Sequence, residues 1–311
     1  MAQLSTQHAQ LLQHGDFLQL TLSNPDGLPS SQFTLPDGSA VSIFDTGVIC
    51  FEPELCESNT KDIVLSCGVH GNETAPIEIC AELVKDLLTG QLQLKHRLLV
   101  LFGNPAAINA GTREITENLN RLFSGHHSMG AGLINAERKR AKALEEYVSR
   151  FYQEVRVTDL VPRNRYLYDL HTAIRGSRFE KFAVYPFLHG NPWQKAEFEF
   201  LQACDVTTVL LMQTPASTFS YYASNSHGAD AFTIELGKVQ PFGENDMRRF
   251  DPKHRRPQKS CPVCHNHPPR TRLIRCSTCA IGVSGTMPWP RLKTWPVPAP
   301  CTTMKALGPL R

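Results

Sequence analysis

The pattern of apolar and polar positions changes its period repeatedly between residues 60 and 240. Asp62–Cys67 and Arg97–Phe102 are short, nearly continuous apolar runs, each followed by glycine, which is typical of buried strands. Between them, apolar residues recur with helical spacing from Pro76 to Leu88, which predicts a helix. The same patterns predict strands over 40–44, 166–170, 182–185, 207–212 and 231–236, and helices over 131–155 and 197–204.

Alternation of strands and helices along one chain is typical of an α/β fold. We therefore predict a mixed sheet flanked by helices, preceded by a hairpin region in the turn-rich first 60 residues. The sequence contains neither a Gly-x-Gly-x-x-Gly motif nor a P-loop, which argues against a dinucleotide-binding or nucleotide-hydrolysing enzyme. In open α/β sheets, ligands bind beyond the carboxyl ends of the strands, so functional residues are expected there.

The composition is that of a globular protein without a membrane segment. Of the 311 residues, 41% are apolar, and no run approaches the ~20 consecutive apolar residues needed to cross a bilayer. The N-terminal residues are polar and lack the basic-then-apolar order of a secretory signal, so we expect a cytoplasmic protein. Ten cysteines in such a chain indicate thiols or metal ligands, because disulfides are rare in that compartment.

The distribution of charge divides the chain near Phe250. Residues 1–250 carry 21 basic and 28 acidic residues, a net charge of −7, whereas the last 61 residues carry 11 basic and one acidic, a net charge of +10. The same C-terminal stretch holds 11 of the 22 prolines and 5 of the 10 cysteines. We therefore predict a main domain over 1–248 and a basic, Pro/Cys-rich tail over 249–311.

Residues with nitrogen or oxygen ligand atoms occur at three predicted strand ends. His70 and Glu73 lie in a glycine-flanked loop after the first buried strand, His171 follows strand 166–170, and Glu235 follows the start of strand 231–236. A catalytic zinc ion takes three protein ligands and keeps one position open, and His70, Glu73 and His171 supply such a set. Asp169 faces the same side of its strand as His171. The alternatives are a hydrogen-bonded core histidine and, for Glu235, a buried ion pair.

Four motifs follow one another in the sequence: GVHGNETAPIE at 68–78, GTREITENLNRLF at 111–123, DLHT at 169–172 and IELGKVQPFG at 234–243. Together they resemble the succinylglutamate desuccinylase/aspartoacylase family over about residues 40–246, with the desuccinylase branch the most similar. This family consists of zinc amidohydrolases related in fold to the zinc carboxypeptidases. The resemblance therefore implies that 1–248 is a zinc hydrolase catalytic domain with a zinc-carboxypeptidase-like fold.

The resemblance also assigns roles to single residues. It implies one Zn²⁺ bound by His70, Glu73 and His171, a catalytic carboxylate at Glu235, and substrate binding by Arg113, Asn120 and Arg121. The implied reaction is hydrolysis of N-succinyl-L-glutamate to succinate and L-glutamate, the last step of the succinyl route of arginine catabolism. N-acyl-aspartate hydrolysis and a carboxypeptidase-like activity are the enzymatic alternatives. The expected partner is a small substrate with several carboxylates. We expect no interaction with a membrane.

The C-terminal stretch allows three interpretations. Two Cys-x-x-Cys pairs, Cys261–Cys264 and Cys276–Cys279, stand eleven residues apart, close to the spacing of a zinc ribbon. The family normally continues here into a smaller β-rich domain, and nothing after Phe250 resembles it, so we predict that 249–311 is frame-shifted or otherwise non-native. A true ribbon and a divergent domain are the alternatives. A zinc-dependent binding protein that uses this tail is the non-enzymatic hypothesis, and nucleic-acid binding is not expected.

Overall fold

The computed structural model describes residues 11–57, 59–130, 134–154 and 162–250. The Cys-x-x-Cys pairs and almost all of the predicted tail lie outside the described residues, so the three interpretations of 249–311 stay predictions. Within the described residues, no helix is both long and apolar enough to cross a membrane.

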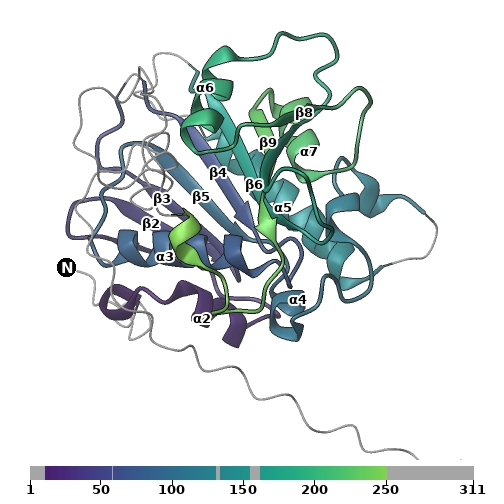
Figure 1. Ribbon diagram of the computed structural model, residues 1–311. Helices are drawn as coiled ribbons and strands as arrows, with labels where there is room; N and C mark the ends of the chain where they lie inside the picture. Colours follow the sequence, from purple (N-terminus) through teal and green to yellow (C-terminus); the bar gives the residue numbers. More distant parts are fainter. Residues whose placement is uncertain (1–10, 58, 131–133, 155–161, 251–311) are drawn as a thin grey trace, which may run out of the picture.

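One mixed sheet organises the described residues (Figure 1), with the strand order β1-β2-β3-β5-β4-β6-β9-β7-β8. Its central strands β5, β4, β6 and β9 are mutually parallel, whereas β1, β2 and β3 continue the sheet as an antiparallel meander. At the other edge, β7 is antiparallel to β9 and parallel to β8. The strands are β1 (Ser31–Thr34), β2 (Ala40–Asp45), β3 (Val48–Glu52), β4 (Asp62–Cys67), β5 (Arg97–Phe102), β6 (Arg165–Ala173), β7 (Lys181–Tyr185), β8 (Val209–Leu211) and β9 (Asp230–Lys238).

Helices cover both faces of this sheet (Figure 1) and bury two separate apolar layers. Helices α2, α3 and α6 contribute to the apolar layer that contains Ile63 and Leu65 of β4, and α5 and α7 contribute to the layer that contains Val64. The predicted α/β fold with a mixed sheet flanked by helices is therefore confirmed. The helices are α2 (Phe17–Ser23), α3 (Thr74–Leu88), α4 (Pro105–Ala110), α5 (Ala136–Gln153), α6 (Lys195–Ala203) and α7 (Phe219–His227), with short 3₁₀ turns η1 (Leu119–Arg121), η2 (His126–Ser128) and η3 (Met247–Phe250).

The structure differs from the sequence prediction in several elements, and helix α4 is one that was not predicted. Strand β6 continues through His171, so this residue lies within the strand and not after it, and β9 extends two residues beyond the predicted strand that contains Glu235. The N-terminal region contains helix α2 as well as strands, because Asp16 caps a short apolar helix that buries Phe17 completely. Helix α7 was not predicted, since its sequence FSYYASNSH has no clear apolar period.

A fully buried arginine joins the strand starts to the end of α5. Arg97 Nε donates to Glu52 at 2.6 Å, one terminal nitrogen donates to Asp62 at 2.9 Å and to the Phe151 carbonyl at 3.1 Å, and the other donates to Glu154 at 2.8 Å. Because the guanidinium has five donors in a fixed planar arrangement, it satisfies groups from β3, β4 and α5 at once. Arg97 thus fixes the end of the sheet opposite to the ends of the parallel strands where ligands are expected.

Replacing Arg97 by Met should destabilise the fold strongly, because the buried Asp62 loses one of its two guanidinium partners and the partly buried Glu52 loses its ion pair with Arg97. We expect a loss of about 3–5 kcal/mol in the free energy of unfolding, measured by urea denaturation. The control is Arg150→Met, which removes an exposed guanidinium that lies over the Phe44 ring, and which should cost about 1 kcal/mol or less. Equal losses in the two variants would contradict this role of Arg97.

A second buried carboxylate makes stability depend on pH. Burial raises the pKa of Glu197 to about 7, although the Tyr168 hydroxyl donates a hydrogen bond to it at 2.8 Å. Since the pKa is higher in the folded state, Glu197 contributes fully below the unfolded pKa, and this contribution is lost as the pH rises through about 7.

Glu197→Gln should therefore stabilise the protein increasingly between about pH 4.5 and pH 7, by up to about 3 kcal/mol. The measurement is the unfolding free energy of both proteins across this range. Glu199→Gln is the control, because Glu199 lies on the same helix, is exposed and forms a surface ion pair with Lys195. Parallel pH profiles of Glu197→Gln and the wild type would contradict the prediction.

Candidate metal centre

Parallel pairing brings the polar residues of three strands to one edge of the sheet. β4, β6 and β9 lie side by side in the same direction, so their carboxyl ends meet. His70 lies in the loop after β4, Glu73 caps the start of α3, and His171 on β6 is the register partner of Glu235 on β9. The loop passes so close to α4 that a Cβ on Gly71 would stand 2.0 Å from the Ala107 carbonyl carbon, so only glycine fits.

The three predicted ligands form one compact buried group. The Nδ1 atoms of His70 and His171 are 3.2 Å apart, and each lies 2.9 Å from one oxygen of Glu73. One ligand atom from each residue falls within 4.8 Å of the others, and all three side chains are buried. Among the described residues, this is the one group of at least three His, Cys, Asp or Glu side chains arranged to hold a metal ion.

The outer nitrogens of the two imidazoles decide which tautomer each ring adopts. His171 Nε2 lies 2.8 Å from Asp169 Oδ2, and His70 Nε2 lies 3.0 Å from Asn118 Oδ1. Both partners are acceptors; the Asn118 oxygen is identified by the amide of Asn120, which donates to it at 3.0 Å. A proton on each Nε2 would satisfy both acceptors and leave each Nδ1 facing Glu73, which is the arrangement that metal ligation requires. Outer-shell acceptors of this kind orient metal-binding histidines.

This donor set fits a cation. Two imidazole lone pairs and a carboxylate converge in a buried space, and without positive charge they would repel one another. Burial raises the Glu73 pKa, but His171 and His70 outweigh it and hold that pKa well below its usual range. Burial lowers the pKa of His171, but Asp169 and Glu73 raise it well above the ordinary value. The group thus favours one positive charge, which a proton or a metal ion with His₂Glu ligation can supply.

The predicted substrate residues lie on one segment, residues 112–121, beside this group. Arg113 donates to Glu73 at 2.7 Å and is partly exposed, and Asn120 Nδ2 lies 3.3 Å from His171 Nε2. Arg121 is exposed and donates to the Asn120 carbonyl at 2.7 Å. Arg175 and Arg178 are exposed, and the structure shows no contact between either of them and the group.

Glu235 is the half-buried carboxylate beside the group. Burial raises its pKa, and the neighbouring carboxylates Glu73 and Asp169 add to this effect, whereas His171 and Arg113 oppose it. Its Oε2 atom has no hydrogen-bond partner among the described residues. A raised pKa brings a carboxylate closer to the range in which it both accepts and returns a proton.

Sequence reasoning missed Asn118, which lies within the same motif as Arg113 and Asn120. Its side chain contacts His70, a residue 48 positions earlier. Asn118 and Asn120 stand two positions apart in the run Glu117-Asn118-Leu119-Asn120, on either side of the buried Leu119. That spacing was the available signal, but it does not identify the partner.

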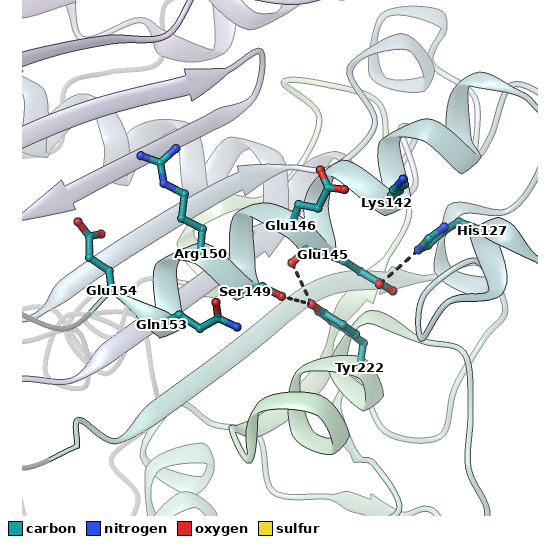
Figure 2. A pocket seen from close by; sticks show the side chains of 9 residues that line it. All are labelled: His127, Lys142, Glu145, Glu146, Ser149, Arg150, Gln153, Glu154 and Tyr222. Carbon is teal, nitrogen blue, oxygen red and sulfur yellow. Dashed lines mark hydrogen bonds and ion pairs between the residues drawn. The ribbon is translucent and has the colours of Figure 1, made fainter.

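A hollow of about 640 Å³ lies on α5, and none of the predicted site residues lines it. Four of its lining residues are joined by hydrogen bonds or ion pairs (Figure 2): the Tyr222 hydroxyl contacts Ser149 at 2.8 Å and donates to the Glu145 carbonyl at 2.9 Å, and His127 pairs with Glu145. Since no predicted site residue reaches this hollow, the chemistry is assigned to the His70 group.

Comparison with known proteins decides the family. The model of the succinylglutamate desuccinylase/aspartoacylase catalytic domain matches residues 59–256. The chain belongs to this family. It is 54% identical over 241 residues to a succinylglutamate desuccinylase of Shewanella sp. (strain MR-4), covering 77% of this chain and 68% of that protein. It is 57% identical over 236 residues to that of Shewanella amazonensis, covering 76% and 67%.

Solved structures support the same assignment. The crystal structure of the succinylglutamate desuccinylase from Chromobacterium violaceum superimposes with a TM-score of 0.68 at 44% identity, covering 76% of this chain and 70% of that chain. The enzyme of that name from Vibrio parahaemolyticus gives the same TM-score at 35% identity, covering 75% and 66%. The predicted resemblance is therefore confirmed at the level of the family and of its desuccinylase branch.

Asp169→Asn should weaken metal binding, because an amide accepts less strongly from His171 Nε2 and permits the wrong tautomer. We expect zinc affinity to fall about 10- to 100-fold, measured by competition with a chromogenic chelator. Asp230→Asn is the matched control: Asp230 begins β9 at the opposite end of the sheet, and accepts a hydrogen bond from Tyr185 at 3.1 Å. An unchanged zinc affinity in Asp169→Asn would exclude this supporting role.

Proposed function

We propose that the protein is a zinc-dependent amidohydrolase that cleaves N-succinyl-L-glutamate to succinate and L-glutamate. The observation that carries this proposal is the convergence of His70 Nδ1, His171 Nδ1 and the Glu73 carboxylate in a member of this family. The proposed substrate is inferred from the chain's relatives, which are named succinylglutamate desuccinylases. We further propose that this reaction ends the succinyl route of arginine catabolism, in the cytoplasm.

The proposed cofactor is one Zn²⁺ held by His70, Glu73 and His171. When bound at such a site, zinc acts as a Lewis acid toward a carbonyl oxygen and makes water more acidic. Its outer support comes from Asp169 and Asn118, which hold the proton of each imidazole on Nε2. These two contacts keep both Nδ1 lone pairs available for the ion.

Glu235 is the proposed acid–base residue. It takes a proton from the water that attacks the succinyl amide carbonyl, and it then passes this proton to the leaving nitrogen of glutamate. A half-buried carboxylate with a raised pKa suits both steps, because it accepts a proton more readily than an ordinary carboxylate and can still return it. Among the described residues, no group donates a hydrogen bond to its Oε2 atom.

The proposed substrate carries three carboxylates, so the binding site requires fixed positive charge. The described body of the chain is acidic overall and offers no general attraction for an anion. Arg113 and Arg121 are the guanidinium groups on the segment beside the metal site, and Asn120 lies next to them. Because arginine binds a carboxylate through two parallel hydrogen bonds, these residues give orientation as well as charge.

The decisive test combines two substrates with one substitution. The wild-type chain should release glutamate from N-succinylglutamate, release little aspartate from N-acetylaspartate, and lose activity when a chelator removes the metal. Glu235→Gln should still bind one zinc ion but lose about 10²- to 10⁴-fold in kcat, because the amide cannot accept the proton. Amino acid release and bound zinc are measured on the same samples.

Each other outcome revises a separate part of the proposal. Aspartate release alone would favour the N-acyl-aspartate alternative, and near-normal kcat in Glu235→Gln would remove Glu235 from the chemistry. Release from neither substrate by the zinc-loaded wild type would favour a carboxypeptidase-like or a non-enzymatic role. Glu244→Gln provides the matched control, because Glu244 is an exposed carboxylate just beyond β9.

A further inference from the structure

The segment 112–121 contacts every member of the His70 group. Arg113 pairs with Glu73 at 2.7 Å, Asn118 holds His70 Nε2 at 3.0 Å, and Asn120 lies 3.3 Å from His171. This segment is mostly irregular and contains only the short turn η1 at its end. Its backbone therefore cannot be fixed by regular helix or sheet hydrogen bonds, and another part of the fold must hold it.

Glu137, in the first turn of α5, provides that support. Its side chain is buried, and its Oε1 atom accepts hydrogen bonds from the backbone amides of Ile115 at 2.7 Å and Thr116 at 3.2 Å. The same oxygen lies 3.5 Å from Asn104 Nδ2, and Asn104 caps α4. Glu137 thus joins α5, the cap of α4 and the middle of the segment that surrounds the metal site.

Burying a carboxylate costs free energy unless hydrogen-bond donors are well placed around it, so the positions of the two backbone amides relative to Glu137 matter. Bonds from amides to a charged acceptor are roughly twice as strong as neutral ones. A second contact lies further along: Arg138 binds Glu117 at 2.7 Å and 2.8 Å through Nε and one terminal nitrogen. That ion pair is more exposed than Glu137, and exposed pairs contribute little, so Glu137 is the main anchor.

We propose that Glu137 is a positioning residue for the metal centre. It touches neither the metal ligands nor the expected substrate. It acts through the backbone of Ile115 and Thr116, which fixes Arg113 on one side and Asn118 on the other. The part of this inference that concerns metal binding rests on the proposed function.

The test compares Glu137→Leu with a matched substitution on the same helix. Glu145 also accepts two backbone amides with one oxygen, from Ser124 at 2.6 Å and Gly125 at 3.4 Å, but those residues contact no member of the His70 group. Glu145→Leu therefore removes the same kind of interaction from α5. In the full-length chain, zinc affinity is measured by chelator competition, and backbone mobility is measured by amide hydrogen exchange.

Glu137→Leu should accelerate exchange across 112–121 and reduce zinc affinity about tenfold or more. Glu145→Leu should accelerate exchange at 124–125 and leave zinc affinity unchanged. Glu137→Gln should restore slow exchange and most of the affinity, because its amide oxygen can replace the Oε1 acceptor. Should Glu137→Leu fail to fold, Glu137→Asp replaces it: it retains the charge but is one methylene too short to reach both amides.

The inference is overturned if Glu137→Leu or Glu137→Asp leaves both the exchange of 112–121 and the zinc affinity unchanged. It is also overturned if Glu145→Leu weakens zinc binding equally, since that would indicate a general loss of stability. If the wild-type chain binds no zinc, the proposed function fails, whereas the exchange comparison still decides whether Glu137 holds the segment.

Discussion

The parallel pairing of β4, β6 and β9 is the constraint on which the rest of the site depends. It brings the loop after β4 beside the last residues of β6 and makes His171 and Glu235 neighbours in register. Because side chains alternate along a strand, Asp169, His171 and Glu235 all face the α5 and α7 side, whereas Leu170 and Ile234 face α3 and α6. One choice of register thus decides which carboxylates surround the metal site.

A high local charge density is the cost of this arrangement. Glu73, Asp169 and Glu235 lie close together with two imidazoles in a largely buried region, where unpaired charge is unfavourable. The opposing pKa shifts of Glu73 and His171 show how the group responds: it retains the carboxylate and takes up positive charge. The surrounding residues limit the tautomers and the net charge of the group. Asp169 and Asn118 restrict the imidazole tautomers, and the positive charge of Arg113 compensates the negative charge of Glu73.

The sequence was most informative where function depends on residues close together in the chain. His70 and Glu73 are three positions apart, and the close approach at Gly71 keeps them on one tight loop, so the local sequence alone indicates their shared role. The buried strands β4 and β5 were predicted with their observed bounds because each is a continuous apolar run. The ends of β6 and β9 were not, since polar site residues interrupt the apolar pattern while the strand hydrogen bonds continue.

The sequence by itself therefore indicated the alternation of elements and the family, and it singled out the residues of the His70 group, because these depend on local periodicity and short motifs. Only the tertiary structure decided that Asn118 orients His70 and that Glu137 holds the segment around the site. Both contacts join residues about 20 to 50 positions apart through backbone or side-chain hydrogen bonds. Such bonds leave no period in the sequence, because they exist only after the sheet has brought its connecting segments together.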